Sequence, residues 1–359
     1  MSPMHYHLLL TEECNLRCTY CGGFEKVQKD ISYDIKTLKE FMAKDPEASI
    51  CFYGGEPTLK PKLIETIMDK VPAKRWSLQT NGTHLEDIRP EYIQRFHTIL
   101  VSIDGGMERT DAYRGKGIYE SVLWNVGHIR WQGYTGDLIA RMVISESSDV
   151  FEDVTHLLRE ASMFSNVHWQ LDVFWSGHEW ADLKGWFDKK YNPGVTKLVN
   201  YWMAHMEKGD VKGIVPFKAL VGLMLKGQKA KLWCGAGRDC FAITPRGELM
   251  ACPIDPSTDF LMAGNITTTS PDTIKGFASV GAPCPSCDIF DICGGRCLYV
   301  NKVRLWGEEA FTIVCGSVRH LVGELKKNLP RIKLLISEGK IPASAFDYPD
   351  GNNNCEIIP

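Results

Sequence analysis

Cysteine is the residue type through which this sequence can do the most chemistry, and its positions along the chain are uneven. Thirteen cysteines occur among 359 residues. One group lies near the N-terminus, Cys51 and Cys355 stand apart, and eight fall between Cys234 and Cys315. No secretory signal precedes them, so we expect a reducing compartment, where thiols bind metals more often than they form disulfides. The distribution predicts two units with different metal chemistry.

The first group has the pattern C-x3-C-x2-C at Cys14, Cys18 and Cys21, with Tyr20 before the last cysteine. Three thiolates on one short loop can bind three irons of a [4Fe-4S] cluster and leave the fourth iron open to another ligand. A zinc loop or three buried free thiols are the alternatives. Because the loop directly follows an apolar segment at residues 6–10, we interpret it as a cluster site with one open iron.

The second group contains enough thiols for two more clusters. It has the spacing C-x5-C, one isolated cysteine, the run C-x2-C-x5-C-x3-C and a last cysteine: Cys234, Cys240, Cys252, Cys284, Cys287, Cys293, Cys297 and Cys315. Eight thiolates can bind two [4Fe-4S] clusters completely, since each cluster needs four. A pair of zinc knuckles is the alternative, because C-x2-C followed by further cysteines is also typical of zinc.

Other candidate ligand contacts stand where apolar segments end. Two adjacent glycines allow the backbone to approach a ligand closely, whereas the simpler interpretation of Gly-Gly-Glu-Pro is a tight turn. A serine at a strand end can cap a loop, and an arginine can pair with a surface carboxylate. The candidates are Gly54, Gly55, Glu56, Ser102, Asp104 and Arg141.

The segments that position these residues alternate between short apolar runs and longer amphipathic ones. We expect strands at residues 6–10, 49–53, 75–79, 98–103, 138–144 and 167–174, and helices near 34–43, 60–70, 90–96, 118–131 and 151–163. This alternation predicts an α/β fold with a parallel sheet and right-handed crossovers. Six units are too few for an eight-fold barrel, so we expect a partial (β/α)6 TIM-like barrel with its reactive site at the carboxyl ends of the strands.

The domain organisation follows from these segments. Residues 1–174 are expected to form the partial barrel, and residues 175–233 a mostly helical, tryptophan-rich bridge. Residues 234–320 hold the second cysteine group in a C-terminal iron-sulfur domain. Residues 321–359 are expected to form a C-terminal helix and a mobile tail that contains Cys355.

Composition excludes several other functions. With 44% hydrophobic and 24% charged residues, the chain is neither disordered nor collagen-like. Its formal charge of -3 gives no bulk electrostatic reason to expect nucleic acid or an anionic membrane as partner. No apolar run approaches the roughly 20 residues that span a bilayer. The expected compartment is the cytosol.

The cysteine loop together with Gly54-Gly55-Glu56-Pro57 resembles the radical S-adenosylmethionine (SAM) enzymes. The resemblance implies that SAM binds the open iron of the first cluster. Electron transfer to its sulfonium would release methionine and a 5'-deoxyadenosyl radical, which takes a hydrogen atom from the substrate. The implied SAM contacts are Tyr20 near the adenine, the backbone of Gly54, Gly55 and Glu56 at the methionine amino group, and Ser102, Asp104 and Arg141 at the ribose and carboxylate.

The second cysteine group resembles the SPASM extension of these enzymes. The resemblance implies that Cys234, Cys240, Cys252 and Cys297 bind one auxiliary [4Fe-4S] cluster, and that Cys284, Cys287, Cys293 and Cys315 bind the other. A fully ligated cluster has no open iron for substrate, so its natural role is to accept an electron from the substrate radical. Net two-electron oxidation is therefore favoured over redox-neutral chemistry.

The SPASM resemblance suggests a peptide or protein side chain as substrate. Candidate outcomes are formylglycine, a thioether, a carbon-carbon or ether crosslink, a dehydrogenation, or epimerisation. Sulfatase-maturing members place an aspartate base directly after the third auxiliary cysteine, where this chain has Pro253, and that departure puts formylglycine in doubt. Asp255 and Asp172 are candidate bases, and Cys355 or Cys51 a candidate hydrogen donor.

Several partners and rival functions remain open. A flavodoxin- or ferredoxin-type protein is the expected electron donor. Because only 13 residues precede Cys14, no N-terminal leader-binding domain is expected. A folded protein target, a separate leader-binding protein or a small metabolite as substrate would each fit. The remaining alternative is a non-catalytic iron-sulfur or zinc scaffold, which the glycine segment and the absence of a basic excess argue against.

Overall fold

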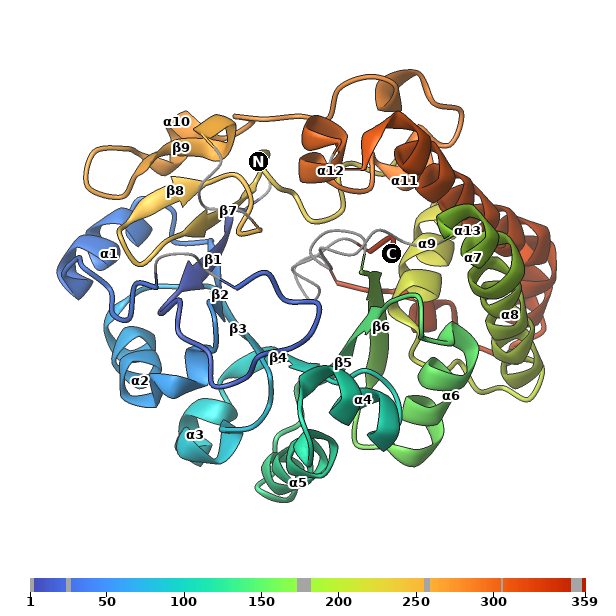
Figure 1. The fold of residues 1–359 in the computed structure, drawn as a ribbon, viewed down its shortest axis with the longest axis horizontal. Coiled ribbons are helices and arrows are strands. Elements are labelled where there is room, and N and C mark those ends of the chain that lie inside the picture. The colour runs from blue at the N-terminus through green and yellow to red at the C-terminus, as the bar shows by residue number, and fades with distance from the viewer. Residues whose placement is uncertain (1–2, 24–26, 173–181, 255–258, 305, 350–356) are drawn as a thin grey trace.

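The computed structural model describes residues 3–23, 27–172, 182–254, 259–304, 306–349 and 357–359. Its central feature is one nine-stranded sheet in the order β6-β5-β4-β3-β2-β1-β7-β8-β9. The sheet curves into an arc, with helices on its outer side (Figure 1). None of the helices in these ranges is long and apolar enough to cross a membrane.

The first six strands pair in parallel and in sequence order. They are β1 (His5–Leu9), β2 (Ser49–Tyr53), β3 (Arg75–Thr80), β4 (Phe96–Ser102), β5 (Asp137–Ile144) and β6 (Asn166–Leu171). The helices between them are α1 (Ile35–Met42), α2 (Pro61–Lys70), α3 (Pro90–Ile93), α4 (Met107–Arg114), α5 (Ile118–Trp131) and α6 (Val150–Glu160). The predicted partial α/β barrel is confirmed, with helix α4 as an additional element.

The cysteine-rich region extends this sheet, which the sequence did not predict. Strand β7 (Cys240–Ile243) pairs in parallel with β1. Strands β8 (Glu248–Met250) and β9 (Met262–Asn265) continue it antiparallel. An open edge on β1 would leave a row of backbone groups unpaired, and β7 satisfies them. The short helices α10 (Pro271–Ile274), α11 (Phe290–Cys293) and α12 (Leu298–Val303) follow.

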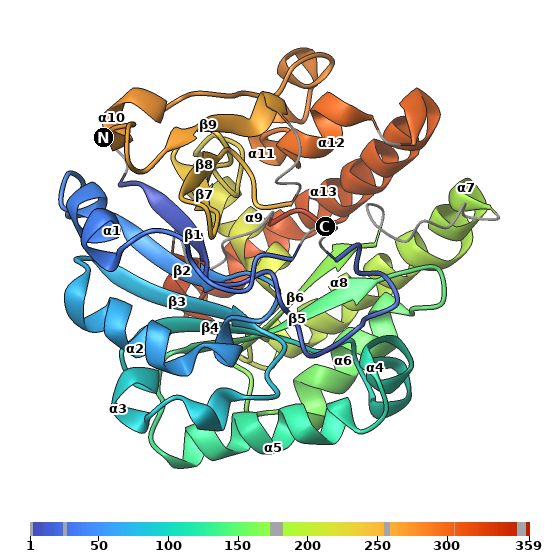
Figure 2. The same ribbon diagram turned by 60° about the vertical axis from the view of Figure 1, so that its left-hand side comes forward.

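The remaining helices pack at the β6 side of the arc (Figure 2). The bridge contains α7 (Leu183–Trp186), a π-helical segment (Phe187–Tyr191), α8 (Asn192–Met206) and α9 (Val215–Leu225). The long helix α13 (Gly307–Ser337) packs against α8 and α9. It runs through residue 320, where the sequence predicted a domain boundary. Short 3-10 turns lie at Pro57–Leu59, Leu85–Asp87, Asp259–Leu261, Cys284–Ser286 and Ala343–Phe346.

The last described residues differ from the expected mobile tail. Ile357 and Ile358 are buried, and Ile357 packs in a small core with Leu100 and Ile139 of neighbouring strands. The backbone oxygen of Pro359 accepts a hydrogen bond from Arg296 Nε (2.8 Å). Burying two isoleucines stabilises this placement by about 2 kcal/mol or more each. The candidate donor Cys355 lies outside the described residues.

Candidate active site

The cysteine loop leaves β1 at its carboxyl end and is held by the loop that follows β2. Gly55 N donates to Thr11 O (2.9 Å), and Glu56 N donates to Glu13 O (2.8 Å). A Cβ atom on Gly54 would lie 2.2 Å from Thr11 O, and one on Gly55 would lie 2.2 Å from Glu13 O. The two glycines are therefore needed for the approach of one loop to the other. These hydrogen bonds occupy the N–H groups of Gly55 and Glu56. The backbone oxygens of the same segment are acceptors that an amino group of a ligand could contact.

Glu56 ties the β2 loop to the end of β3. Its carboxylate, which is 1% exposed, accepts from Thr58 N (2.9 Å), Thr80 Oγ1 (2.7 Å) and Asn81 N (2.6 Å). Burial raises the pKa of Glu56, and these hydrogen bonds counteract the rise. The carboxylate of Glu56 therefore bonds to protein groups and not to a ligand. A ligand would contact the backbone of this segment instead.

Asn81, which is bonded to Glu56, also contacts the cysteine loop. Its side-chain nitrogen lies 2.8 Å from Asn15 Oδ1 and 3.9 Å from Cys14 Sγ, while its oxygen accepts from Thr83 N (3.0 Å). The strand ends of β1, β2 and β3 therefore form one hydrogen-bonded unit around the first cysteine.

Ser102 and Arg141 lie side by side, because they are register partners on β4 and β5. Among the described residues, the buried Nε atom of Arg141 has no hydrogen-bond partner. An unpaired buried guanidinium nitrogen is costly, so a group that accepts its hydrogen bond would stabilise the site. A carboxylate such as that of SAM has the required chemistry.

Asp104 and Tyr20 have protein partners instead. Tyr20 Oη donates to Asp104 Oδ2 (2.8 Å), and Arg114 pairs with both oxygens of the same carboxylate. Desolvation and the nearby carboxylate raise the pKa of Tyr20, so the phenol keeps its proton. Both expected SAM contacts are thus joined to each other and to Arg114, a residue that the sequence analysis missed.

The three thiols of the loop have the chemistry of iron ligands, although burial disfavours the thiolate forms of Cys14 and Cys18 when no metal is bound. Burial raises the pKa of Cys14, and it raises the pKa of Cys18 to about 11, an effect that the guanidinium of Arg114 opposes. Cys18 interacts electrostatically with both Cys14 and Cys21. Three soft sulfur donors on one loop, with an open side, fit the ligation of a [4Fe-4S] cluster by three thiolates. Binding of iron would release the thiol protons.

The C-terminal cysteines gather in two sets. In the first, burial raises the pKa of Cys240, and the nearby thiols of Cys234 and Cys252 raise it further. The second set shares mutual electrostatic effects in the same way and comprises Cys284, Cys287, Cys293 and Cys315. Cys297 is buried at the start of α12. No three described side chains converge as ligands of a single metal ion do, whereas a cluster distributes its thiolates over several irons.

Two thiols of the second set receive hydrogen bonds from the protein. Asn301 Nδ2 lies 3.4 Å from Cys284 Sγ. Arg319 Nη2 lies 3.1 Å from Cys287 Sγ and 2.6 Å from Asp288 Oδ1. Hydrogen bonds to cluster sulfurs are among the factors that set a cluster's reduction potential. Neither donor could be predicted from the local spacing of the cysteines.

The two cysteine regions are joined by a buried carboxylate. Glu12 accepts from Arg246 Nη1 (3.0 Å) on the β7–β8 turn and from Gln28 N (2.6 Å). The Glu12 side chain is 2% exposed, so this ion pair is shielded from water on one side. It connects the N-terminal cysteine loop to strands β7 and β8, of which β7 begins at Cys240 and β8 ends two residues before Cys252.

Of the candidate bases and hydrogen-atom donors, the described residues include Asp172 and Cys51. Asp172 follows β6 at the carboxyl edge of the sheet and is buried, with its backbone N–H bonded to Ile144 O (2.7 Å). Cys51 is fully buried in β2, as expected for a packed thiol. Asp255, like Cys355, lies outside the described residues.

The fold and the site define a class of protein: a partial α/β barrel that presents three thiols on one loop at the carboxyl ends of its strands. The model of the radical SAM superfamily matches residues 8–158 of this chain. The chain is a radical SAM enzyme, and SAM and a [4Fe-4S] cluster are the cofactors that this membership implies. The expectation of an enzyme is thereby confirmed over the alternative of a non-catalytic scaffold.

Similar proteins include curated maturases. The mycofactocin maturase MftC of Mycolicibacterium smegmatis is 27% identical over 80% of this chain and 76% of the relative. MftC of Mycobacterium tuberculosis (strain CDC 1551) is 26% identical over 92% of this chain and 88% of the relative.

Solved structures share the fold. A structure of anSMEcpe with bound AdoMet has a TM-score of 0.74 at 18% identity, and the match covers 96% of this chain and 98% of the other. Streptococcus suis SuiB bound to precursor peptide SuiA has a TM-score of 0.57 at 15% identity, covering 85% and 74%.

Proposed function

We propose that this enzyme matures a peptide or protein by net two-electron oxidation of a side chain. The observation that carries the proposal is the pairing of a radical SAM barrel with two sets of C-terminal thiols. The curated relatives that span most of the chain are named as maturases of mycofactocin, and this supports a peptide rather than a metabolite as substrate. A crosslink, a thioether or a dehydrogenation are the outcomes that fit.

The proposed SAM site uses residues from four strand ends. Cys14, Cys18 and Cys21 would hold the first cluster. The backbone of Gly54 and Gly55 would receive the methionine amino group, and Arg141 with Ser102 would bind the carboxylate and ribose. When bound, the cluster and SAM together supply a 5'-deoxyadenosyl radical. The protein's part is to hold SAM so that this radical forms beside the substrate.

Two auxiliary [4Fe-4S] clusters are proposed for the C-terminal region. The mutual electrostatic effects of Cys284, Cys287, Cys293 and Cys315 support one set of four ligands. Those of Cys234, Cys240 and Cys252 support three ligands of the other. Cys297, which is buried, is proposed as the fourth. With every iron bound by a thiolate, neither cluster would have an open position for substrate.

Net oxidation of the side chain requires acceptors for a hydrogen atom, an electron and a proton. The substrate would lose a hydrogen atom to the radical that SAM and the first cluster would supply, an electron to a cluster held by the C-terminal thiols, and a proton to a base. It would therefore lose two hydrogens in total. An external donor, a flavodoxin- or ferredoxin-type protein, would supply the electron that SAM cleavage needs. Asp172 is the proposed base, because it is a buried carboxylate at the carboxyl edge of β6.

Anaerobic co-expression with short reading frames encoded beside the gene, with or without a separate leader-binding protein, tests the proposal. We expect one peptide to lose two hydrogens, as measured by high-resolution mass spectrometry, and a Cys18→Ala enzyme to leave it unchanged. An unchanged mass with deuterium uptake from solvent would indicate an epimerase instead. Formation of 5'-deoxyadenosine with no altered peptide would favour a metabolite as substrate.

A further inference from the structure

Helix α4 is attached directly to the cysteine loop. Thr19 N donates to Tyr113 O (2.9 Å). The rings of Tyr20 and Tyr113 meet edge to face at 5.5 Å between centroids. The two residues that precede Cys21 are therefore both held by the last turn of this helix.

A buried ion pair lies under this contact. Arg114 Nε is 2.7 Å from Asp104 Oδ2, and Arg114 Nη2 is 3.0 Å from Asp104 Oδ1. The Asp104 side chain is 0% exposed and that of Arg114 is 6% exposed. The guanidinium carbon lies 5.5 Å from the centroid of the Tyr20 ring. One arginine thus contacts the carboxylate and the face of the aromatic ring together.

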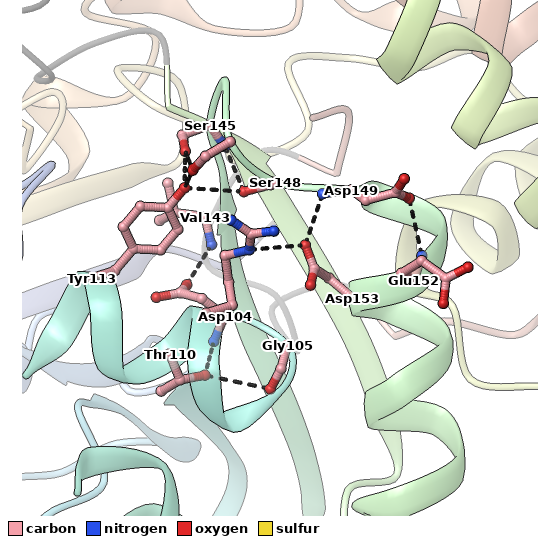
Figure 3. A network of polar contacts seen from close by, with 12 residues as sticks. Asp104, Gly105, Thr110, Tyr113, Val143, Ser145, Ser148, Asp149, Glu152 and Asp153 are labelled. Atoms are coloured by element: carbon pink, nitrogen blue, oxygen red, sulfur yellow. Dashed lines mark hydrogen bonds and ion pairs between the residues drawn. The ribbon is translucent and has the colours of Figure 1, made fainter. Parts of the chain in front are cut away.

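The carboxylate has no acceptor capacity left for a ligand. Besides Arg114 and Tyr20, Asp104 Oδ1 accepts from Val143 N (2.9 Å), while Asp104 N donates to Thr110 Oγ1 (3.1 Å). A carboxylate offers about four lone-pair positions, and four donors from the protein occupy them. Figure 3 shows Asp104, which follows β4, bonded to Val143 of β5 and to Thr110 of α4.

The outer side of α4 is fixed as well. Arg109 Nε lies 3.6 Å from Asp153 Oδ2 on α6. Tyr113 Oη contacts the hydroxyls of Ser145 and Ser147 after β5. Figure 3 shows the Asp153 carboxylate and the serine hydroxyls on either side of the Asp104 contacts. The helix is therefore held on two sides before it meets the cysteine loop.

We propose that Asp104 and Arg114 are positioning residues for the first cluster: they orient Tyr20 for SAM and set the electrostatic potential at Cys18. This rests on the proposed ligation by Cys14, Cys18 and Cys21. Removing one partner of a buried ion pair is costly because the other charge stays unpaired. Since arginine keeps its proton in proteins, an unpaired Arg114 would remain a cation beside Cys18.

The test compares Asp104→Asn with the double variant Asp104→Asn/Arg114→Gln in the reconstituted enzyme. EPR-monitored redox titration should show the first cluster at a more positive potential in D104N, because the guanidinium is no longer balanced. The double variant should return toward the wild-type potential. A D104N potential equal to wild type, or a shift that persists in the double variant, overturns the proposal. The auxiliary clusters serve as the internal reference.

Two further variants separate positioning from general stability. Tyr20→Phe removes only the hydroxyl that bonds Asp104, and we expect full iron content with SAM binding weakened about tenfold in EPR titrations. Unchanged SAM affinity overturns the orienting role. Arg109→Gln is the matched control, since Arg109 pairs with Asp153 on the same helix, and it should leave both the potential and the SAM affinity unchanged. None of these readouts needs a peptide substrate, so they stand apart from the test of the proposed function.

Discussion

At the scale of single residues, two side chains donate hydrogen bonds to thiols of the second set. Arg319 and Asn301 each donate to one sulfur of the second set. Neither was predictable, because a helix residue gives no local sign that it faces a thiol far away in sequence. The three cysteines of the first loop were predictable, since their spacing alone fits a cluster.

Arg319→Gln should lower the reduction potential of the auxiliary cluster for which Cys287 is a proposed ligand. The variant removes a positive charge and a hydrogen bond from one ligand sulfur, and second-shell changes of this kind cost about 10- to 100-fold in activity. EPR-monitored redox titration measures the shift. Arg331→Gln is the control, because Arg331 lies on the same helix, is similarly exposed and pairs with Glu207 instead. Equal potentials in both variants would contradict a role for Arg319.

Gly55→Ala should prevent assembly of the first cluster. The added Cβ would lie 2.2 Å from Glu13 O, so the β2 loop and the cysteine loop could not both keep their positions. We expect loss of the corresponding iron and, without that cluster, loss of SAM cleavage. Gly323→Ala is the control: nothing lies within 4 Å of its added Cβ, and a helical alanine stabilises by roughly 0.5–1 kcal/mol. Full iron content in G55A would show that the loops can separate.

At the scale of elements, the chain order of strands and helices followed from hydrophobic periodicity, and β2 and α5 were predicted to the residue. Helix α4 was missed because its eight residues, MERTDAYR, show no amphipathic repeat. It is stabilised by tertiary contacts, among them Arg109 with Asp153. Strand β7 was missed because its partner β1 lies far away in the sequence.

The stability of the protein should depend on pH through Asp153, which lies where α6 contacts α4. Burial raises the pKa of Asp153 from 3.8 to about 6, although Arg109 opposes the rise. The folded state therefore binds this proton more tightly than the unfolded state, and the stabilisation present at low pH is lost as the pH rises through about 6. The Asp153→Asn protein should lack this loss, worth roughly 2–3 kcal/mol.

Anaerobic thermal unfolding of both holoproteins at pH 5 and pH 7 measures the effect. Wild type should lose more stability than D153N between the two values. An equal change in the two proteins would mean that Asp153 ionises at its ordinary pKa.

At the scale of the whole molecule, one continuous sheet joins the two cysteine regions. The Glu12–Arg246 pair and the β1–β7 pairing both bridge them. Sequence patterns predicted both regions but not their connection, because a contact between residues 12 and 246 leaves no trace in local spacing. The burial of Ile357 and Ile358 was missed for the same reason: glycine and asparagine before them predict mobility, whereas their own apolar side chains pack in the core.

The central claim is that an auxiliary cluster held by the C-terminal thiols would accept an electron from the substrate, and Cys315→Ala tests it most directly. With the peptide found by co-expression, 5'-deoxyadenosine and the peptide that has lost two hydrogens are quantified from the same anaerobic reaction. The account predicts that C315A still forms 5'-deoxyadenosine while the oxidised peptide falls to a small fraction of the wild-type yield. Oxidised peptide in the same ratio to 5'-deoxyadenosine as in wild type would contradict it.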